Sequence, residues 1–88
     1  MKTSFRKSFA RDLKKIKDQR LLERVRQVIE AVEAAADLRE IDDLKRLSGT
    51  TNLYRIRVGD HRFGLVIEDQ TVEFVRCLPR RDLYRFFP

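Results

Sequence analysis

Arginine is concentrated in the last 36 residues of the chain, from Leu53 to Pro88. All six lysines lie at or before Lys45, so every basic residue in this last part is an arginine. They are Arg55, Arg57, Arg62, Arg76, Arg80, Arg81 and Arg85. A guanidinium group is planar, stays charged at any physiological pH and can bind two phosphate oxygens at once. The concentration therefore predicts a polyphosphate partner, with RNA as the first candidate.

Three of these arginines are spaced so that they should share one surface. Arg55 and Arg57 are separated by one apolar residue, and side chains two positions apart on a strand lie on the same face, about 7 Å apart at their Cα atoms. Arg62 follows the pair Gly59-Asp60, which is typical of a short hairpin turn. We therefore expect Arg62 on the neighbouring strand, on the same side.

The end of the chain adds two more arginines and a phenol. Pro79 cannot continue a strand ladder, so Arg80 and Arg81 should leave the last strand there, and Tyr84 follows within a turn. Guanidiniums in this arrangement can hold the phosphates that flank a bond and neutralise charge that develops on the reacting phosphate. Tyr84 can stack on a base or donate a hydrogen bond. The alternative is that the arginines only keep a small domain soluble while the ring of Tyr84 packs on the core.

Other reactive side chains are isolated. His61 is the only histidine and has no partner residues for a metal site, so we expect it in a surface turn. Cys77 lies in an apolar strand pattern, which favours a buried structural thiol. Asp82 is expected to pair locally with Arg81 or Arg85. The sequence predicts neither a metal site nor a cofactor.

Three strands should position the arginines. Residues 53–58 and 62–67 alternate apolar and other side chains, and residues 71–78 are apolar on both sides, as a central strand would be. Short turns at Gly59-Asp60 and at residues 68–70 imply an antiparallel meander.

Helices are predicted before the meander. Residues 9–17 and 21–36 carry apolar side chains at helical spacing, and Ser8 is placed to cap the first helix. Residues 3–6 are a weak strand candidate. Between residues 37 and 49 an apolar residue recurs every three positions, which favours helical turns on the core. These residues are Leu38, Ile41, Leu44 and Leu47.

The predicted architecture is a single α+β domain over residues 1–88. It has an N-terminal strand, a two-helix hairpin and a three-stranded antiparallel meander, with both helices on one sheet face. The other face, with the arginines, should be free. The formal net charge of +6 favours anionic partners. We expect a cytoplasmic protein without a membrane partner, because no apolar run approaches about 20 residues and the N-terminus lacks a secretory signal.

Three segments resemble the RelE/ParE superfamily of bacterial toxin–antitoxin systems, and specifically its RelE-like mRNA interferase branch. They are Leu44-Lys45-Arg46-Leu47-Ser48-Gly49, Tyr54-Arg55-Ile56-Arg57-Val58-Gly59-Asp60-His61-Arg62 and Arg80-Arg81-Asp82-Leu83-Tyr84-Arg85. The resemblance implies a ribosome-dependent endoribonuclease that cuts mRNA in the A site by attack of the ribose 2′-OH and so inhibits translation. It implies catalytic roles for Arg62, Arg81 and Tyr84. It also implies RNA binding by Arg55, Arg57, Arg80 and Lys45.

The same resemblance implies a set of partners. A cognate antitoxin would hold the toxin inactive, the ribosome and mRNA would be its targets, and promoter DNA would be bound only through the antitoxin complex. Some relatives have lysines where this chain has Arg55 and Arg57, and often a histidine where it has Pro79. Because arginine cannot give up a proton, the general base is left to the substrate, the ribosome or Tyr84. A ParE-like inhibitor of DNA gyrase and a weakly catalytic nucleic-acid-binding relative remain the alternatives.

Overall fold

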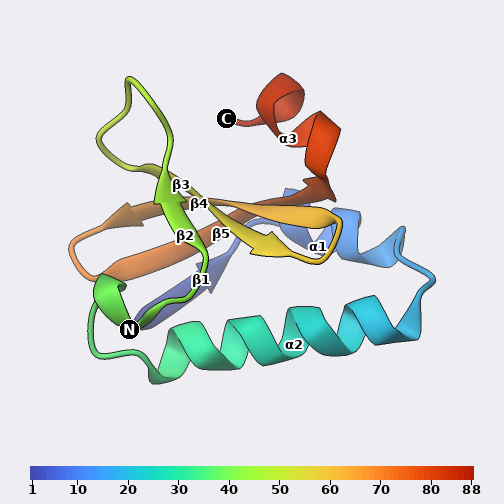
Figure 1. Cartoon of the computed structure of the whole chain (residues 1–88), viewed down its shortest axis with the longest axis horizontal. Coiled ribbons are helices and arrows are strands. Elements are labelled where there is room, and N and C mark those ends of the chain that lie inside the picture. Colours follow the sequence, from blue (N-terminus) through green and yellow to red (C-terminus); the bar gives the residue numbers. More distant parts are fainter.

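A computed structural model describes the whole chain, residues 1–88, and places a five-stranded sheet between two layers of helix (Figure 1). The elements are β1 (Lys2–Phe5), α1 (Lys7–Lys14), α2 (Gln19–Ala34), the one-turn 3₁₀ helix η1 (Leu38–Glu40), β2 (Leu44–Arg46), β3 (Leu53–Val58), β4 (His61–Glu68), β5 (Thr71–Pro79) and α3 (Arg80–Phe86). This order confirms the α+β class. It adds a strand, β2, and a helix, α3, that were not predicted.

The sheet has the strand order β1-β5-β4-β3-β2. Strands β3, β4 and β5 form the predicted antiparallel meander, and β1 joins it in parallel with β5. The turn between β3 and β4 contains Gly59, whose φ of 60° is readily adopted by glycine. The weak strand prediction at residues 3–6 is therefore confirmed as β1, at the edge of the sheet.

The segment between α2 and β3 is only partly helical. Leu38–Glu40 forms η1, but Leu44–Arg46 forms β2 and pairs antiparallel with β3. The prediction of helical turns up to Leu47 is wrong for this second half. Three-residue spacing does not exclude a strand, and pairing with β3 gives the backbone N–H and C=O groups of β2 partners that a short isolated turn would leave to water.

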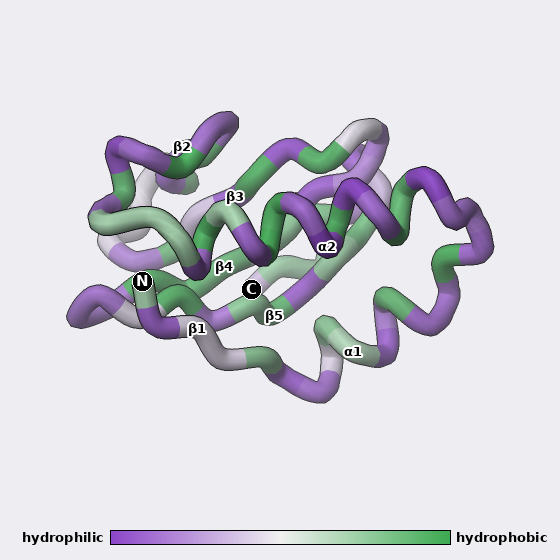
Figure 2. The backbone as a smooth tube through the Cα atoms, turned by 90° about the horizontal axis from the view of Figure 1, so that it is seen from below, coloured by the Kyte–Doolittle hydropathy of each residue, from purple (hydrophilic) through white to green (hydrophobic).

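Both α1 and α2 pack on one face of the sheet, as predicted. The buried core unites Phe9, Val25 and Val32 from the helices with Ile56, Val58, Phe63, Leu65, Val72 and Phe74 from the strands. The ring of Phe9 lies 5.2 Å from that of Phe63 and 5.3 Å from that of Phe74, between centroids. Apolar and polar residues alternate along α2 (Figure 2), as the helix needs one side for this core and one for water.

The two helix starts differ from the predicted ones. α2 begins after Asp18, whose carboxylate accepts hydrogen bonds from the N–H groups of Arg20 and Leu21 at 2.9 and 3.3 Å. The prediction that Ser8 caps α1 is wrong: α1 begins at Lys7, and the Ser8 hydroxyl donates to the carbonyl of Val75 instead. None of the helices is long and apolar enough to cross a membrane.

A buried carboxylate fastens α1 to the sheet. Asp12 is 5% exposed and accepts hydrogen bonds from Arg76 Nε and Nη2 at 2.8 and 3.1 Å, and from the Cys77 N–H at 2.9 Å. β1 pairs with β5 only as far as Phe74. Asp12 therefore satisfies a backbone donor of β5 beyond the point where its neighbouring strand ends.

The second sheet face is only half free, which corrects the predicted open face. Helix α3 packs on β4 and β5 there, and Leu83 and Phe87 form a small second core with Val75. Gly64 permits this approach, because a Cβ at that position would lie 2.8 Å from ring carbons of Phe87. The part of this face over β2 and β3 is not covered by α3, and the arginines lie beside the helix.

Candidate functional site

The strand register places the predicted basic residues together. Arg55 lies opposite Lys45 of β2, and Arg57 lies opposite Arg62 of β4. Because residues paired across strands share a face, all four side chains leave the sheet on the side away from α1 and α2. This confirms the geometry predicted from the spacing. We call this surface, together with Arg80 and Tyr84 described below, the arginine face.

Arg62 is the buried residue of the arginine face. Only 7% of its surface is exposed, although arginine side chains are mostly exposed in proteins. Its Nη1 donates to the carbonyl oxygens of Gly59 at 3.0 Å and His61 at 2.8 Å, so the hairpin that carries it also orients it. Arg55 is held similarly, because its Nη1 donates to the Asp43 carbonyl at 3.1 Å. Both guanidiniums keep further N–H groups for a ligand.

The electrostatic environment of Arg62 is repulsive. Its pKa is lowered first by burial and then by the neighbouring charges of Arg57, Arg55 and Arg80, while Tyr84 acts in the opposite direction. No carboxylate contributes to this balance. Arg62 nevertheless stays charged, because an arginine cannot be deprotonated in a protein. A phosphate would relieve the repulsion, so the arrangement favours an anionic ligand.

Helix α3 supplies the remaining groups. The N–H of Arg80 donates to the Asp60 carbonyl at 2.8 Å, which ties the start of α3 to the β3–β4 turn. The charge of Arg80 acts on Arg62, and so does Tyr84, which is 63% exposed and free to stack on a base. The structure thus gathers Lys45, Arg55, Arg57, Arg62, Arg80 and Tyr84 around one surface.

Arg81 is not part of this surface. It precedes the buried Leu83 by two residues, which is about 200° of rotation on a helix of 3.6 residues per turn, so it lies on the outer side of α3. It is exposed and is absent from the charges that act on Arg62. The structure thus brings Arg80, and not Arg81, next to Arg62, and the catalytic role predicted for Arg81 stays a prediction. The helical phase of Leu83 and Phe87 was the signal that distinguishes them.

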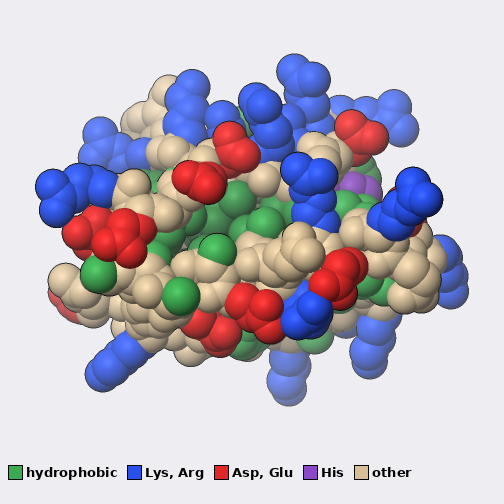
Figure 3. All heavy atoms as spheres, turned by 60° about the horizontal axis from the view of Figure 1, so that its bottom comes forward, with side chains coloured by type: hydrophobic (Ala, Val, Ile, Leu, Met, Phe, Trp, Pro, Cys, Tyr) green, Lys and Arg blue, Asp and Glu red, His purple; other side chains and the backbone are tan.

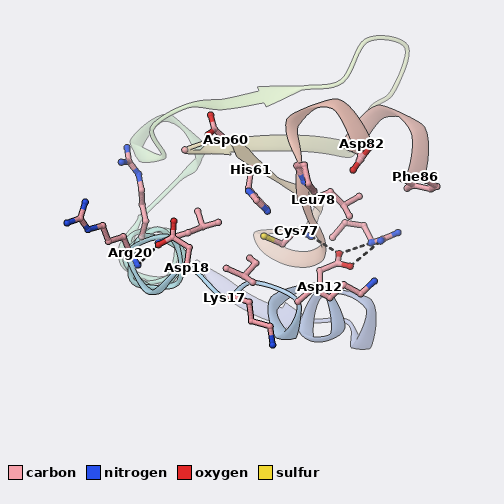
Figure 4. A pocket seen from close by; sticks show the side chains of 17 residues that line it. Asp12, Lys17, Asp18, Arg20, Asp60, His61, Cys77, Leu78, Asp82 and Phe86 are labelled. Carbon is pink, nitrogen blue, oxygen red and sulfur yellow. Dashed lines mark hydrogen bonds and ion pairs between the residues drawn. The ribbon is translucent and has the colours of Figure 1, made fainter.

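The other reactive residues lie on the opposite side of the β3–β4 hairpin, around a pocket of about 910 Å³ (Figure 4). His61 points into this pocket and is partly exposed, and it is the first residue of β4, not part of the turn in which it was predicted. Its Nδ1 is buried without a hydrogen-bond partner, and burial lowers its pKa although Asp60 raises it. Asp82 also lines the pocket and forms no ion pair with Arg81 or Arg85, contrary to the prediction.

Cys77 is a structural thiol, as predicted. It is 2% exposed, and burial together with the nearby charge of Asp12 raises its pKa to about 12. A protonated, inaccessible thiol is a poor nucleophile and a poor metal ligand. The structure contains no group of histidine, cysteine and carboxylate side chains suited to a metal ion.

Comparison with known proteins gives a consistent result. Residues 4–84 match the model of the family described as ParE toxin of the type II toxin–antitoxin system parDE. Toxin RelE3 of Methanocaldococcus jannaschii is 36% identical over 89 residues, and the match covers the full length of both chains.

Solved structures agree with this match. The RelB–RelE antitoxin–toxin complex from Methanococcus jannaschii superimposes with a TM-score of 0.81 at 34% identity, covering 97% of this chain and 99% of that one. The RelBE2 toxin–antitoxin complex from Mycobacterium tuberculosis gives a TM-score of 0.72 at 26% identity, with coverages of 90% and 96%. The YoeB dimer from Staphylococcus aureus, at 18% identity and a TM-score of 0.70, shares the fold over 89% of this chain and 94% of that chain.

Proposed function

Since the chain belongs to the RelE/ParE family of toxins from type II toxin–antitoxin systems, we propose that it is an endoribonuclease that cuts mRNA in the ribosomal A site and so stops translation. The observation that carries this proposal is the arginine face. Arg62 is buried against two carbonyl oxygens, the charges of Arg57, Arg55 and Arg80 act on it, and none of the four arginines forms an ion pair with a carboxylate.

The reaction supported by these groups is a transesterification within the RNA. The 2′-oxygen of a ribose attacks the adjacent phosphorus, the O2′–P bond forms, and the bond from phosphorus to the 5′-oxygen of the next nucleotide breaks. Arg62 and Arg80 stabilise the additional negative charge of the phosphorane, since fixed donors aimed at developing charge contribute most to catalysis. Arg55, Arg57 and Lys45 hold the flanking phosphates. Tyr84 stacks on a base.

Proton transfer is the part of the reaction that the arginine face does not supply. The 2′-OH must lose a proton and the leaving 5′-oxygen must gain one. His61 is on the opposite side of the hairpin, and the groups that act on Arg62 are guanidiniums and the phenol of Tyr84. Tyr84, the RNA or the ribosome must therefore accept the proton. A site that is rich in anion stabilisers and poor in bases supports dependence on the ribosome.

The proposed partner in the cell is a cognate antitoxin. Two of the similar structures described above, RelB–RelE and RelBE2, are toxin–antitoxin complexes. In this chain a protein with acidic side chains placed over Arg55, Arg57 and Arg62 would neutralise the repulsion among them and block access of RNA. We propose that promoter DNA is bound only through the complex with the antitoxin.

The decisive test is primer extension on ribosomes programmed with a defined mRNA. Wild-type protein should cut within the A-site codon, and Arg80→Ala should reduce the rate by about 10²–10³, the range for loss of one stabilising donor. Arg81→Ala is the matched control, because it removes an adjacent exposed arginine on the outer side of α3. Equal losses in both variants would contradict the assignment of Arg80, and absence of cutting by the wild type would contradict the proposed function.

Inhibition of DNA gyrase is the second candidate, because the matching family model is described as ParE toxin. A supercoiling assay on the same preparation separates the two activities. Blocked supercoiling without any cut in ribosome-bound mRNA would replace the first candidate by the second.

A further inference from the structure

The pocket behind the β3–β4 hairpin takes no part in the reaction proposed above. Its volume of about 910 Å³ is within the range of about 300–1,000 Å³ that is common for small-molecule sites. A Cβ added to Gly59 would lie 3.8 Å from Leu21 Cδ1, so the turn of the hairpin lies against α2 at one wall of the pocket. The apolar lining comes from the α1–α2 connection, α2, β5 and α3, through Ile16, Leu21, Leu78, Pro79 and Phe86.

The charged side chains around the pocket do not select a charged ligand. Asp12 is paired with Arg76, and Asp18 caps α2. Lys17 and Arg20 point away from the pocket into solvent (Figure 4). In the space-filling view, basic and acidic side chains likewise project around the borders of the molecule (Figure 3). The remaining charged residues of the lining are two carboxylates and two cations, whose charges cancel: Asp60, Asp82, Lys15 and Arg24. The electrostatics therefore favour an uncharged ligand.

His61 is the hydrogen-bonding group that the pocket offers. Its ring points into the pocket and forms no hydrogen bond with another residue (Figure 4). Nδ1 is the only buried side-chain nitrogen or oxygen of the protein that lacks a partner, whereas Nε2 is not among the buried atoms. Burial lowers the pKa of His61, so the ring is neutral at neutral pH. Polar groups without partners are rare inside proteins, and a whole imidazole without one indicates a place for a ligand.

A small aromatic molecule with a hydroxyl group matches both properties of the pocket. Its ring can pack on apolar side chains such as those of Ile16 and Leu21. The hydroxyl group both donates and accepts, so it can pair with Nε2 in either tautomer of the neutral imidazole. A ligand of the same shape without a polar atom would cover Nε2 and leave it unpaired, which weakens binding.

We propose that this pocket binds a small uncharged phenol, with its hydroxyl group on Nε2 of His61 and its ring on Ile16 and Leu21. The site adjoins the arginine face without being part of it. The carbonyl oxygens of Gly59 and His61 accept hydrogen bonds from Arg62, and both residues also line the pocket. A bound molecule therefore contacts, from the helix side, the residues that orient Arg62. The inference does not depend on the proposed function.

The test compares two probes of one shape, 4-methylphenol and para-xylene, in which a methyl group replaces the hydroxyl group. Each is titrated into isotope-labelled protein at about pH 7.5, and binding is followed by NMR. 4-Methylphenol should saturate with a Kd of about 1 mM and shift the signals of Ile16, Leu21 and His61, but not that of Val32 near the other end of α2. para-Xylene should bind about three- to tenfold more weakly, because it leaves Nε2 without a partner.

Two variants locate the site. His61→Phe keeps an aromatic ring without nitrogen atoms and should abolish the preference for 4-methylphenol over para-xylene. Ile16→Trp should fill the pocket and prevent binding of both probes. Its control is Leu22→Trp, because Leu22 is also partly exposed but does not line the pocket, and binding there should be unchanged. A thermal denaturation curve establishes that each variant is folded, and the comparison of the two probes on the wild type needs no variant.

Three results would overturn the inference. They are no saturable binding of 4-methylphenol up to about 10 mM, equal affinity of the wild type for the two probes, and undiminished binding by folded Ile16→Trp. The last result would place the probe elsewhere on the protein. Because the titrations contain neither RNA nor ribosomes, a failure to cut mRNA counts against the proposed function alone.

Discussion

The arginine face and a second basic surface lie on opposite sides of one sheet and hold their charges differently. The second one, which we call the lysine surface, lies over α1, the connection to α2 and the first turns of α2, and consists of Lys7, Arg11, Lys14, Lys15, Lys17, Arg20 and Arg24. On the arginine face, Arg62 is buried, is fixed by two carbonyl oxygens and is repelled by three other arginines. On the lysine surface all seven side chains are exposed and none forms an ion pair. The first arrangement concentrates charge at one point before a ligand arrives, at a cost in stability. The second distributes charge along a helix and can adapt to a partner, but it orients nothing.

The largest effect that separates the two surfaces is expected at Arg62. Arg62→Ala should lower the cleavage rate on programmed ribosomes by about 10²–10³, because it removes a pre-oriented donor at the reacting phosphate. Lys14→Ala, which removes one exposed charge from the lysine surface, should lower the cleavage rate only a few-fold, and this effect should become smaller as salt is raised. A thermal denaturation curve for each variant establishes that it is folded. Comparable losses of cleavage rate in Arg62→Ala and Lys14→Ala would show that it makes no difference to function whether a charge is buried and oriented or exposed and mobile.

The second effect concerns the anchor of the lysine surface. Asp12→Asn leaves Arg76 without its carboxylate in a largely buried position, and we expect a loss of about 2–4 kcal/mol in the free energy of unfolding, measured by urea denaturation. Asp18→Asn is the control, since asparagine caps a helix about as well as aspartate, and it should cost less than about 0.5 kcal/mol. A small effect at Asp12 would mean that α1 is held by Phe9 and its apolar neighbours alone.

The third effect concerns the support of the arginine face. Gly64→Ala places a Cβ against the ring of Phe87 and should cost about 1–3 kcal/mol by overpacking. Because Arg80 and Tyr84 are carried by α3, cleavage should fall together with hydrogen-exchange protection of residues 80–87. Unchanged protection in this segment would indicate that the ring moves aside and that α3 does not depend on its contact with Gly64.

The smallest effect is a pH dependence from His61, which lies on the hairpin between the two surfaces. Burial lowers its folded-state pKa below the ordinary value of 6.5, so the unfolded chain binds more protons between the two values. The stability contributed by His61 is therefore present above about pH 6.5 and is lost as pH falls through the folded pKa. The free energy of unfolding should decrease from pH 7.5 to 5, and His61→Gln should flatten that decrease. If His61→Gln and the wild type show the same dependence of the free energy of unfolding on pH, His61 is not the source of the decrease.

Alternation and turn residues were enough to predict the meander and the shared face of Arg55, Arg57 and Arg62, because a strand repeats every two residues. They did not predict β2, since three residues of Leu44–Arg46 are too few to show a period. Nor did they resolve Arg80 from Arg81, which depends on the phase of a helix whose existence was not predicted. The role of Asp12 was also hidden. A carboxylate on an amphipathic helix looks the same in sequence whether it faces water or a backbone donor at the end of a strand.

Four residues of the arginine face belong to the sheet, and two, Arg80 and Tyr84, belong to α3. This helix is held by the hydrogen bond from the Arg80 N–H to the Asp60 carbonyl and by the contacts of Leu83 and Phe87. During synthesis the sheet residues leave the ribosome before residues 80–87 do. If the protein cuts mRNA as proposed, a nascent chain has no assembled site while its own message is still being read through this segment. The order of the elements along the chain thus delays assembly of the proposed site until α3 has been synthesised and has left the ribosome.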